Sequence, residues 1–130
     1  MSIFTVAMTV RDYECDMQGV VNNAVYQNYL EHARHEFLKA RGLNFARLTE
    51  QQINVVVVRA ELDYRRSLRS GDAFLVTVQT ERESRLRLTF VQRIVHADSG
   101  QTMLEARIIT TAVNPRGRPY LPAALEVLLD

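Results

Sequence analysis

Three carboxylates, a glycine and two asparagines lie within the short segment from Asp12 to Asn23. The acids are Asp12, Glu14 and Asp16, and the asparagines directly precede a stretch with helical periodicity. Free N–H donors at a helix N-terminus stabilise an oxyanion, and a nearby carboxylate can attack a carbonyl or activate water beside it. Because acids and asparagines before a helix are also typical of ordinary caps, the spacing alone leaves both interpretations open.

A long amphipathic helix is predicted to follow this segment. Asn22 and Asn23 are good N-caps, because an amide oxygen accepts from the free N–H groups of the first turn. Gly42, which follows Arg41, ends the helix. The apolar positions recur with the helical period and form one stripe, made of Val25, Tyr26, Tyr29, Leu30, Ala33 and Phe37.

Alternation of apolar and polar residues predicts strands in the rest of the chain. Short polar turns, such as Ser84-Arg85 and Asp98-Ser99-Gly100, separate successive stretches and imply antiparallel neighbours. The predicted strands are Ser2–Val10, Ile53–Arg66, Ala73–Glu83, Leu86–His96 and Gln101–Val113.

The remaining segments predict connections and short helices. The segment from Arg11 to Val21 is interpreted as a loop, and Asn44–Gln52 as a short second helix. Pro115, Gly117 and Pro119 break the last strand, and Pro122 opens a terminal helix over Ala123–Leu129.

The order of elements predicts an α+β fold in which an antiparallel sheet wraps one long helix. No repeat or linker divides the sequence, so residues 1–130 are expected to form a single domain. The outer sheet face and the edge strands would stay uncovered. We therefore expect self-association that buries the partly apolar face of Ile109, Thr111 and Val113.

The composition restricts the class of protein. The formal charge is only +1 over 130 residues, which does not suggest a dedicated nucleic-acid binder. Cys15 is the only cysteine, so no internal disulfide can form. No apolar run is long enough to cross a bilayer, and the first residues do not resemble a signal peptide. A cytoplasmic location is therefore expected.

The segment from Val10 to Leu38 resembles the signature of the hotdog-fold acyl thioesterases, in the branch related to 4-hydroxybenzoyl-CoA thioesterase. Within that branch it is most similar to the plant acyl-lipid thioesterases and their bacterial relatives. Leu68–Asp72 also matches the family's turn between two sheet strands. The matching positions are Asp16, Gly19, Val20, Val21, Tyr26 or Tyr29, and Arg34.

The resemblance implies a five- or six-stranded antiparallel sheet around one helix. It also implies homodimers that often pair into homotetramers, with active sites between subunits. Asp16 takes the place of the catalytic carboxylate, and Asn23 falls where the helix-start N–H polarises the thioester carbonyl. Many relatives have His or Tyr where this chain has Asn23, so a role of that histidine side chain in positioning water is absent here.

The implied activity is hydrolysis of acyl-CoA or acyl-carrier-protein thioesters, fatty acyl or β-ketoacyl, without metal or organic cofactor. Asp16 acts as nucleophile or as general base; the sequence does not distinguish the two. Gly19 permits close approach of the backbone to a substrate, beside Val20 and Val21. The remaining candidate substrate-binding residues are Tyr26 and Tyr29, as core or tunnel residues, and Arg65, Arg66 and Arg69, as phosphate or carrier-protein contacts or a solvated strand end.

Other interpretations have weaker support in the sequence. A non-catalytic acyl-binding or assembly subunit would have no use for a carboxylate beside a carbonyl, and an aromatic acyl-CoA thioesterase of quinone or polyketide biosynthesis remains an alternative. A dehydratase of the same fold would need a histidine in the helix-start loop. Cys15 has no histidine close in sequence, and His32, His35 and Glu36 do not project to one face as metal ligands.

Overall fold

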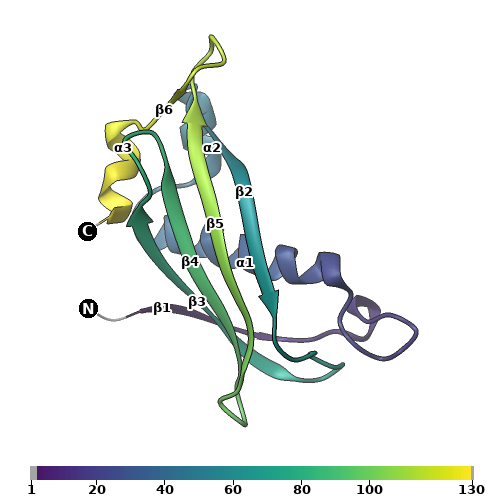
Figure 1. Ribbon diagram of the computed structural model, residues 1–130. Helices are drawn as coiled ribbons and strands as arrows, with labels where there is room; N and C mark the ends of the chain where they lie inside the picture. Colours follow the sequence, from purple (N-terminus) through teal and green to yellow (C-terminus); the bar gives the residue numbers. More distant parts are fainter. Residues whose placement is uncertain (1–2, 130) are drawn as a thin grey trace.

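The computed structural model describes residues 3–129 and all of their side chains but that of Phe45. One antiparallel sheet curves around a long helix, α1, as expected from the sequence (Figure 1). The strand order is β1-β3-β4-β5-β2, and the short β6 pairs with β5. The strands are β1 (Phe4–Thr9), β2 (Asn54–Tyr64), β3 (Ala73–Arg82), β4 (Leu88–His96), β5 (Thr102–Val113) and β6 (Pro119–Tyr120).

Helix α1 (Asn23–Ala40) begins and ends where its capping residues predict. The Asn22 side chain accepts a hydrogen bond from Ala24 N at 3.0 Å, and Gly42 follows the helix with a φ of 81°. Only glycine adopts a positive φ without a steric penalty, so the chain leaves the helical direction at Gly42. Most of the predicted stripe is confirmed, since Tyr26, Tyr29, Leu30, Ala33 and Phe37 are buried. Val25 is only partly buried, and Leu38, which was not predicted, is buried too.

The inner face of the sheet supplies the other half of the core. Along β3 the buried residues Phe74, Val76 and Val78 alternate with partly exposed ones. Along β5 Leu104 and Ile108 belong to the same core cluster as the helix stripe. Period-two alternation therefore places one apolar face of each strand against α1.

The shorter helices lie at the margins of the sheet. The 3-10 helix η1 (Asp12–Glu14) interrupts the predicted Arg11–Val21 loop, and α2 (Phe45–Glu50) follows the cap residue Asn44. The C-terminal helix α3 (Ala123–Glu126) continues into the 3-10 helix η2 (Val127–Leu129). Among residues 3–129 there is no helix with the length and hydropathy to span a membrane.

Two predictions need correction. Pro119 was expected only to break the last strand, yet it begins β6, where the first residue of a strand needs no N–H. Ile109 and Thr111 were expected to offer a self-association face, but within one chain they are 6% and 4% exposed. The Thr111 hydroxyl donates to Leu86 O at 2.6 Å, so the turn before β4 already contacts this face.

Two further predictions are not settled. Residue 2, where the first strand was expected to begin, lies outside the described residues. That residues 1–130 form a single domain stays a prediction.

Candidate functional site at the start of α1

A tight loop from Cys15 to Val21 presents Asp16 beside the helix start. Cys15 and Val21 form an antiparallel bridge across the loop. Inside it, Asp16 N donates to Val20 O at 2.9 Å, and Gly19 N donates to Asp16 O at 3.0 Å. Gly19 has a φ of 81°, which a residue with a side chain adopts only with strain. The glycine is therefore required by the loop's own geometry.

The Asp16 carboxylate is exposed and partly engaged by its own loop. Its Oδ1 accepts from Gln18 N at 2.9 Å and from Val20 N at 3.4 Å. These bonds fix the direction of the carboxylate relative to the backbone. Oδ2 has no hydrogen-bond partner within residues 3–129, so one oxygen stays available to a substrate or a water.

The first available backbone donor of α1 belongs to Asn23. The preceding N–H, of Asn22, donates to Glu14 O at 3.0 Å, and the following one, of Ala24, donates to the Asn22 side chain. The Asn23 N–H has no acceptor in the part of the chain that the structure describes. It lies at the positive end of the helix dipole, where it can polarise a carbonyl oxygen.

Glu14 and Tyr29 hold this loop on the helix through a contact that sequence reasoning missed. Glu14 Oε1 accepts from the Tyr29 hydroxyl at 2.8 Å and from Arg11 N at 2.8 Å. The Glu14 side chain is only 11% exposed, and burial together with this carboxylate raises the pKa of the Tyr29 hydroxyl. A tyrosine inside an apolar stripe needs a partner for its O–H, which is the signal that sequence reasoning could have used.

Tyr26 and the loop residues Val20 and Val21 hold the opposite side of the loop. The Tyr26 hydroxyl accepts from Leu68 N at 2.9 Å, and burial raises its pKa. Val21 N donates to Leu68 O at 2.9 Å, and Val20 forms a bridge with Arg69. Tyr26 and Tyr29 are thus both buried in this chain, with hydroxyls bonded to the protein.

The three candidate arginines divide into two kinds. Arg69 lies beside the loop, because a Cβ built on Gly19 would come within 4.0 Å of Arg69 Nη1. The Arg65 guanidinium is already paired with Glu105 at 2.9 Å. The Arg66 side chain is exposed and has no partner among the described residues. Arg66 and Arg69 are therefore the two with free guanidinium groups.

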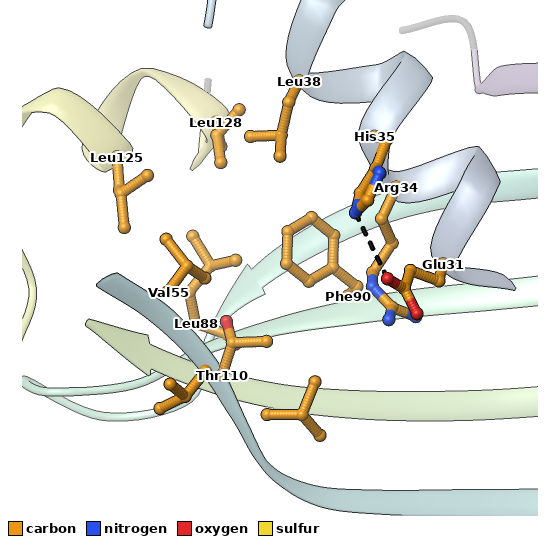
Figure 2. A pocket seen from close by; sticks show the side chains of 12 residues that line it. Glu31, Arg34, His35, Leu38, Val55, Leu88, Phe90, Thr110, Leu125 and Leu128 are labelled. Atoms are coloured by element: carbon orange, nitrogen blue, oxygen red, sulfur yellow. Dashed lines mark hydrogen bonds and ion pairs between the residues drawn. The ribbon is translucent and has the colours of Figure 1, made fainter. Parts of the chain in front are cut away.

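A cavity of about 360 Å³ lies between α1 and β2 (Figure 2). Glu31, Arg34 and His35 line one side, and Leu38, Leu125 and Leu128 line the other. A smaller pocket of about 130 Å³ shares Glu31, Arg34 and Val57 with it and extends to Gln27. We call the two together the α1–β2 groove. A tunnel was expected beside Tyr26 and Tyr29, but neither lines this groove, whose walls come from segments far apart in the sequence.

The polar groups beside the groove pair with one another. His35 Nε2 lies 3.6 Å from Glu31 Oε1, and Arg34 Nη1 donates to Gln92 Oε1 at 3.0 Å. Burial lowers the pKa of both Arg34 and His35.

His32 contacts Glu36 at 3.9 Å elsewhere on the helix. Across residues 3–129, no three His, Cys, Asp or Glu side chains gather as a metal site would require.

Comparison with known proteins places this architecture in a family. Residues 10–126 match the model of the thioesterase-like superfamily. The acyl-acyl carrier protein thioesterase ATL3 of Arabidopsis thaliana chloroplasts is 37% identical over 122 residues, which are 93% of this chain and 64% of the plant protein. The chain thus spans slightly under two thirds of that relative's length.

Two further comparisons agree. The long-chain acyl-CoA thioesterase FadM of Escherichia coli is 31% identical over 117 residues, 90% of this chain and 86% of the relative. The crystal structure of the 1,4-dihydroxy-2-naphthoyl-CoA thioesterase Slr0204 from Synechocystis superposes with a TM-score of 0.91 at 21% identity, covering 98% of this chain and 96% of that one. The expected hotdog fold is confirmed, and the chain belongs to the thioesterase-like superfamily.

Proposed function

We propose that this protein hydrolyses acyl thioesters to a free acid and a thiol. One observation carries the proposal. An exposed Asp16 carboxylate lies in the Cys15–Val21 loop, and a free Asn23 N–H lies at the helix start that follows it. The N–H would donate to the thioester carbonyl oxygen and stabilise the negative charge that develops there. Removing one such donor typically costs about 2.7–4 kcal/mol of transition-state stabilisation.

Asp16 supplies the second half of the reaction. Its free Oδ2 either attacks the carbonyl carbon and forms an anhydride that water opens, or removes a proton from a water that attacks directly. In both routes the C–S bond breaks, the sulfur leaves as thiolate and takes up a proton, and the oxygen of water ends in the acid. Both routes need one free carboxylate oxygen, which Oδ2 supplies.

Arg66 and Arg69 are the proposed contacts for the thiol-bearing part of the substrate. A free guanidinium binds phosphate or carboxylate in a bidentate manner, which suits coenzyme A and the acidic surface of a carrier protein. The names of the relatives include carrier-protein and CoA thioesterases, so both substrates belong in the test. Arg65 is the poorer candidate, because its guanidinium already forms an ion pair with Glu105.

We also propose that two copies pair through β2. This strand is an edge of the sheet, and Val56, Val57 and Val58 are 39%, 50% and 43% exposed on it. An exposed apolar edge strand favours pairing with another chain. The pairing would place a second copy next to the α1–β2 groove, in a homodimer that could pair further into a homotetramer.

The test is release of thiol from a panel of thioesters. Fatty acyl, β-ketoacyl and aromatic acyl groups would each be offered on CoA and on carrier protein, and matched oxygen esters would serve as controls. Turnover of at least one thioester, with little turnover of its oxygen ester, supports the proposal. Tight binding of acyl groups without turnover of any thioester would contradict it and favour a non-catalytic acyl-binding subunit.

A further inference from the structure

The α1–β2 groove runs along the helix from near the proposed reaction centre to the C-terminal segment. Gln27, at one end, is one helical turn beyond Asn23, and Leu38, at the other, is eleven residues beyond Gln27. At 1.5 Å per residue this distance is roughly 16 Å along the axis. Each leaflet of a bilayer's hydrocarbon core is about 15 Å deep and is filled by one long fatty acyl chain. The groove therefore has the length of such a chain.

The groove walls suit a hydrocarbon at the end far from Asn23. There the cavity is lined by Leu38, Val55, Leu88 and Phe90, and it ends at Leu125 and Leu128 (Figure 2). Near Gln27 the charged groups are bonded to neighbours, Glu31 with His35 and Arg34 with Gln92, so their aliphatic stems remain for apolar contact. The polar-to-apolar gradient matches an acyl chain whose thioester end lies at the helix start.

The far end is a fixed wall, because two contacts attach the C-terminal segment to β3. The Thr80 hydroxyl donates to Leu128 O, and Arg82 pairs with Glu126 at 3.0 Å. Leu125 and Leu128 are themselves 4% and 1% exposed. Because both leucines are buried and Thr80 holds the segment to β3, this wall limits the length of the cavity.

We infer that α3 and η2 set the longest acyl chain the enzyme accepts, with Leu125 and Leu128 as the residues that stop the chain. The inference rests on the proposed function and deepens it, since it names long aliphatic acyl groups as the substrate class. It assigns chain-length selection to the C-terminal segment and leaves the chemistry to the helix start.

The experiment measures kcat/KM for octanoyl-, dodecanoyl-, hexadecanoyl- and eicosanoyl-CoA, and the affinity for the four free acids by calorimetry. Leu128→Ala lengthens the groove and Leu125→Phe shortens it. Leu48→Ala is the control, because Leu48 is equally buried in α2 and does not line the groove. The Phe variant adds bulk, so it tests the inference even if the Ala variant is too unstable to assay.

The expected result is a shift of the preferred chain length in opposite directions for the two groove variants. Each additional methylene that a lengthened groove admits should raise kcat/KM and affinity about fourfold. Each methylene that a shortened groove excludes should lower both by about the same factor. Leu48→Ala should keep the wild-type profile. Turnover with the same profile in all variants would overturn the inference alone. Absence of turnover with shifted fatty-acid affinities would overturn the proposed hydrolysis and leave the assignment of the groove standing.

Discussion

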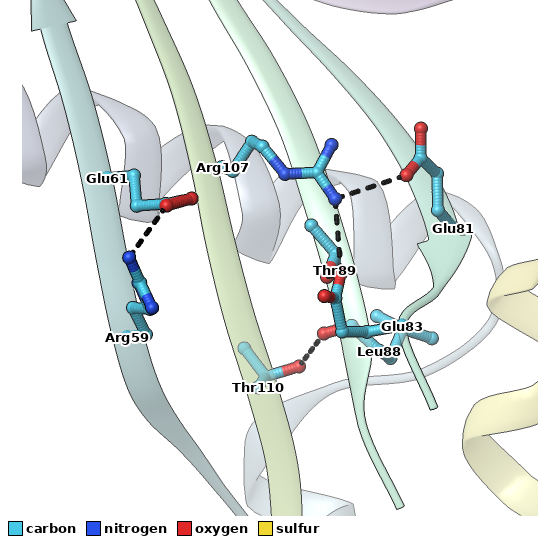
Figure 3. A network of polar contacts seen from close by, with 8 residues as sticks. All are labelled: Arg59, Glu61, Glu81, Glu83, Leu88, Thr89, Arg107 and Thr110. Atoms are coloured by element: carbon cyan, nitrogen blue, oxygen red, sulfur yellow. Dashed lines mark hydrogen bonds and ion pairs between the residues drawn. The ribbon is translucent and has the colours of Figure 1, made fainter. Parts of the chain in front are cut away.

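The two faces of the sheet use their charged residues differently. On the outer face Arg107 pairs with Glu81 at 3.3 Å and with Glu83 at 3.1 Å, and Arg59 pairs with Glu61 at 3.2 Å (Figure 3). Exposed pairs of this kind contribute little to stability, because water solvates each charge almost as well. The outer network is thus satisfied within the chain and offers few free groups to a ligand.

On the inner side, where α1 meets the sheet, the polar groups are fewer and their environment is more apolar. Arg34 has a neutral amide, Gln92, as its hydrogen-bond partner, and Glu14 is held by the Tyr29 hydroxyl. At the start of α1 the Asn23 N–H and Asp16 Oδ2 are free within residues 3–129. Charge density therefore does not mark the proposed site. Backbone and carboxylate groups without a partner in the described chain, at the start of α1, do.

The largest stability difference between the faces should appear on β5. Leu104→Ala removes a fully buried side chain from the inner face and should lower the free energy of unfolding by about 2–5 kcal/mol. Urea denaturation of the variant and the wild type measures the loss. A loss below 1 kcal/mol would mean that the inner face does not carry the core.

The next effect concerns the brace between the loop and the helix. Tyr29→Phe keeps the ring but removes the donor to Glu14, so a nearly buried carboxylate loses a hydrogen bond. We expect a loss of about 1–3 kcal/mol in the free energy of unfolding. Because Glu14 O also binds Asn22 N, kcat should fall more than KM rises. An unchanged kcat would show that the brace does not position the site.

The contribution of one outer-face contact should depend on pH and disappear in acid. The Thr89 hydroxyl, at 2.7 Å, and Arg107 hold the pKa of Glu83 below its ordinary value of 4.5. A lowered carboxyl pKa stabilises the fold above pH 4.5, and this stabilisation is lost as the pH falls through the folded-state value. Thr89→Val should therefore be less stable than wild type near neutrality, and the gap should narrow below pH 4.5. Thermal melts across that range measure it, and a constant gap would contradict the assignment.

The smallest effect is expected for an outer ion pair. Glu105→Gln removes the partner of Arg65, and both side chains are about half exposed. The free energy of unfolding should change by only about 0.2–1 kcal/mol, and less at high salt. The same urea titration used for Leu104→Ala, its neighbour on β5, gives the direct comparison. Equal losses for the two variants would remove the distinction between the faces.

Much of the fold could be predicted because its signals are local. The Asn22 cap, the apolar stripe from Tyr26 to Phe37 and Gly42 place α1 within a residue or two, and alternation locates the five longer strands. Strand β6 was missed, because two residues give no periodicity and Pro119 usually ends a strand. Its pairing depends on the partner strand, which sequence periodicity does not show.

The site was predictable only in part, for the same reason. Asp16, Gly19 and Asn23 lie within one loop, so their spacing was visible in the sequence. The Glu14–Tyr29 hydrogen bond joins residues fifteen apart, and the groove combines α1 with β2 and the C-terminal segment. Such contacts arise from tertiary packing, which no short pattern encodes.

The most direct test of the account compares two carboxylates of the segment that joins β1 to α1. Asp12 and Asp16 are both exposed, and each has one carboxylate oxygen bonded within the chain, but only Asp16 belongs to the Cys15–Val21 loop that leads into the Asn23 N–H. The measurement is the kcat of thiol release by Asp16→Asn and Asp12→Asn on the best thioester of the wild type. We expect about a 100-fold or greater loss for Asp16→Asn and less than a tenfold loss for Asp12→Asn. A folded Asp16→Asn variant with full activity would contradict the account.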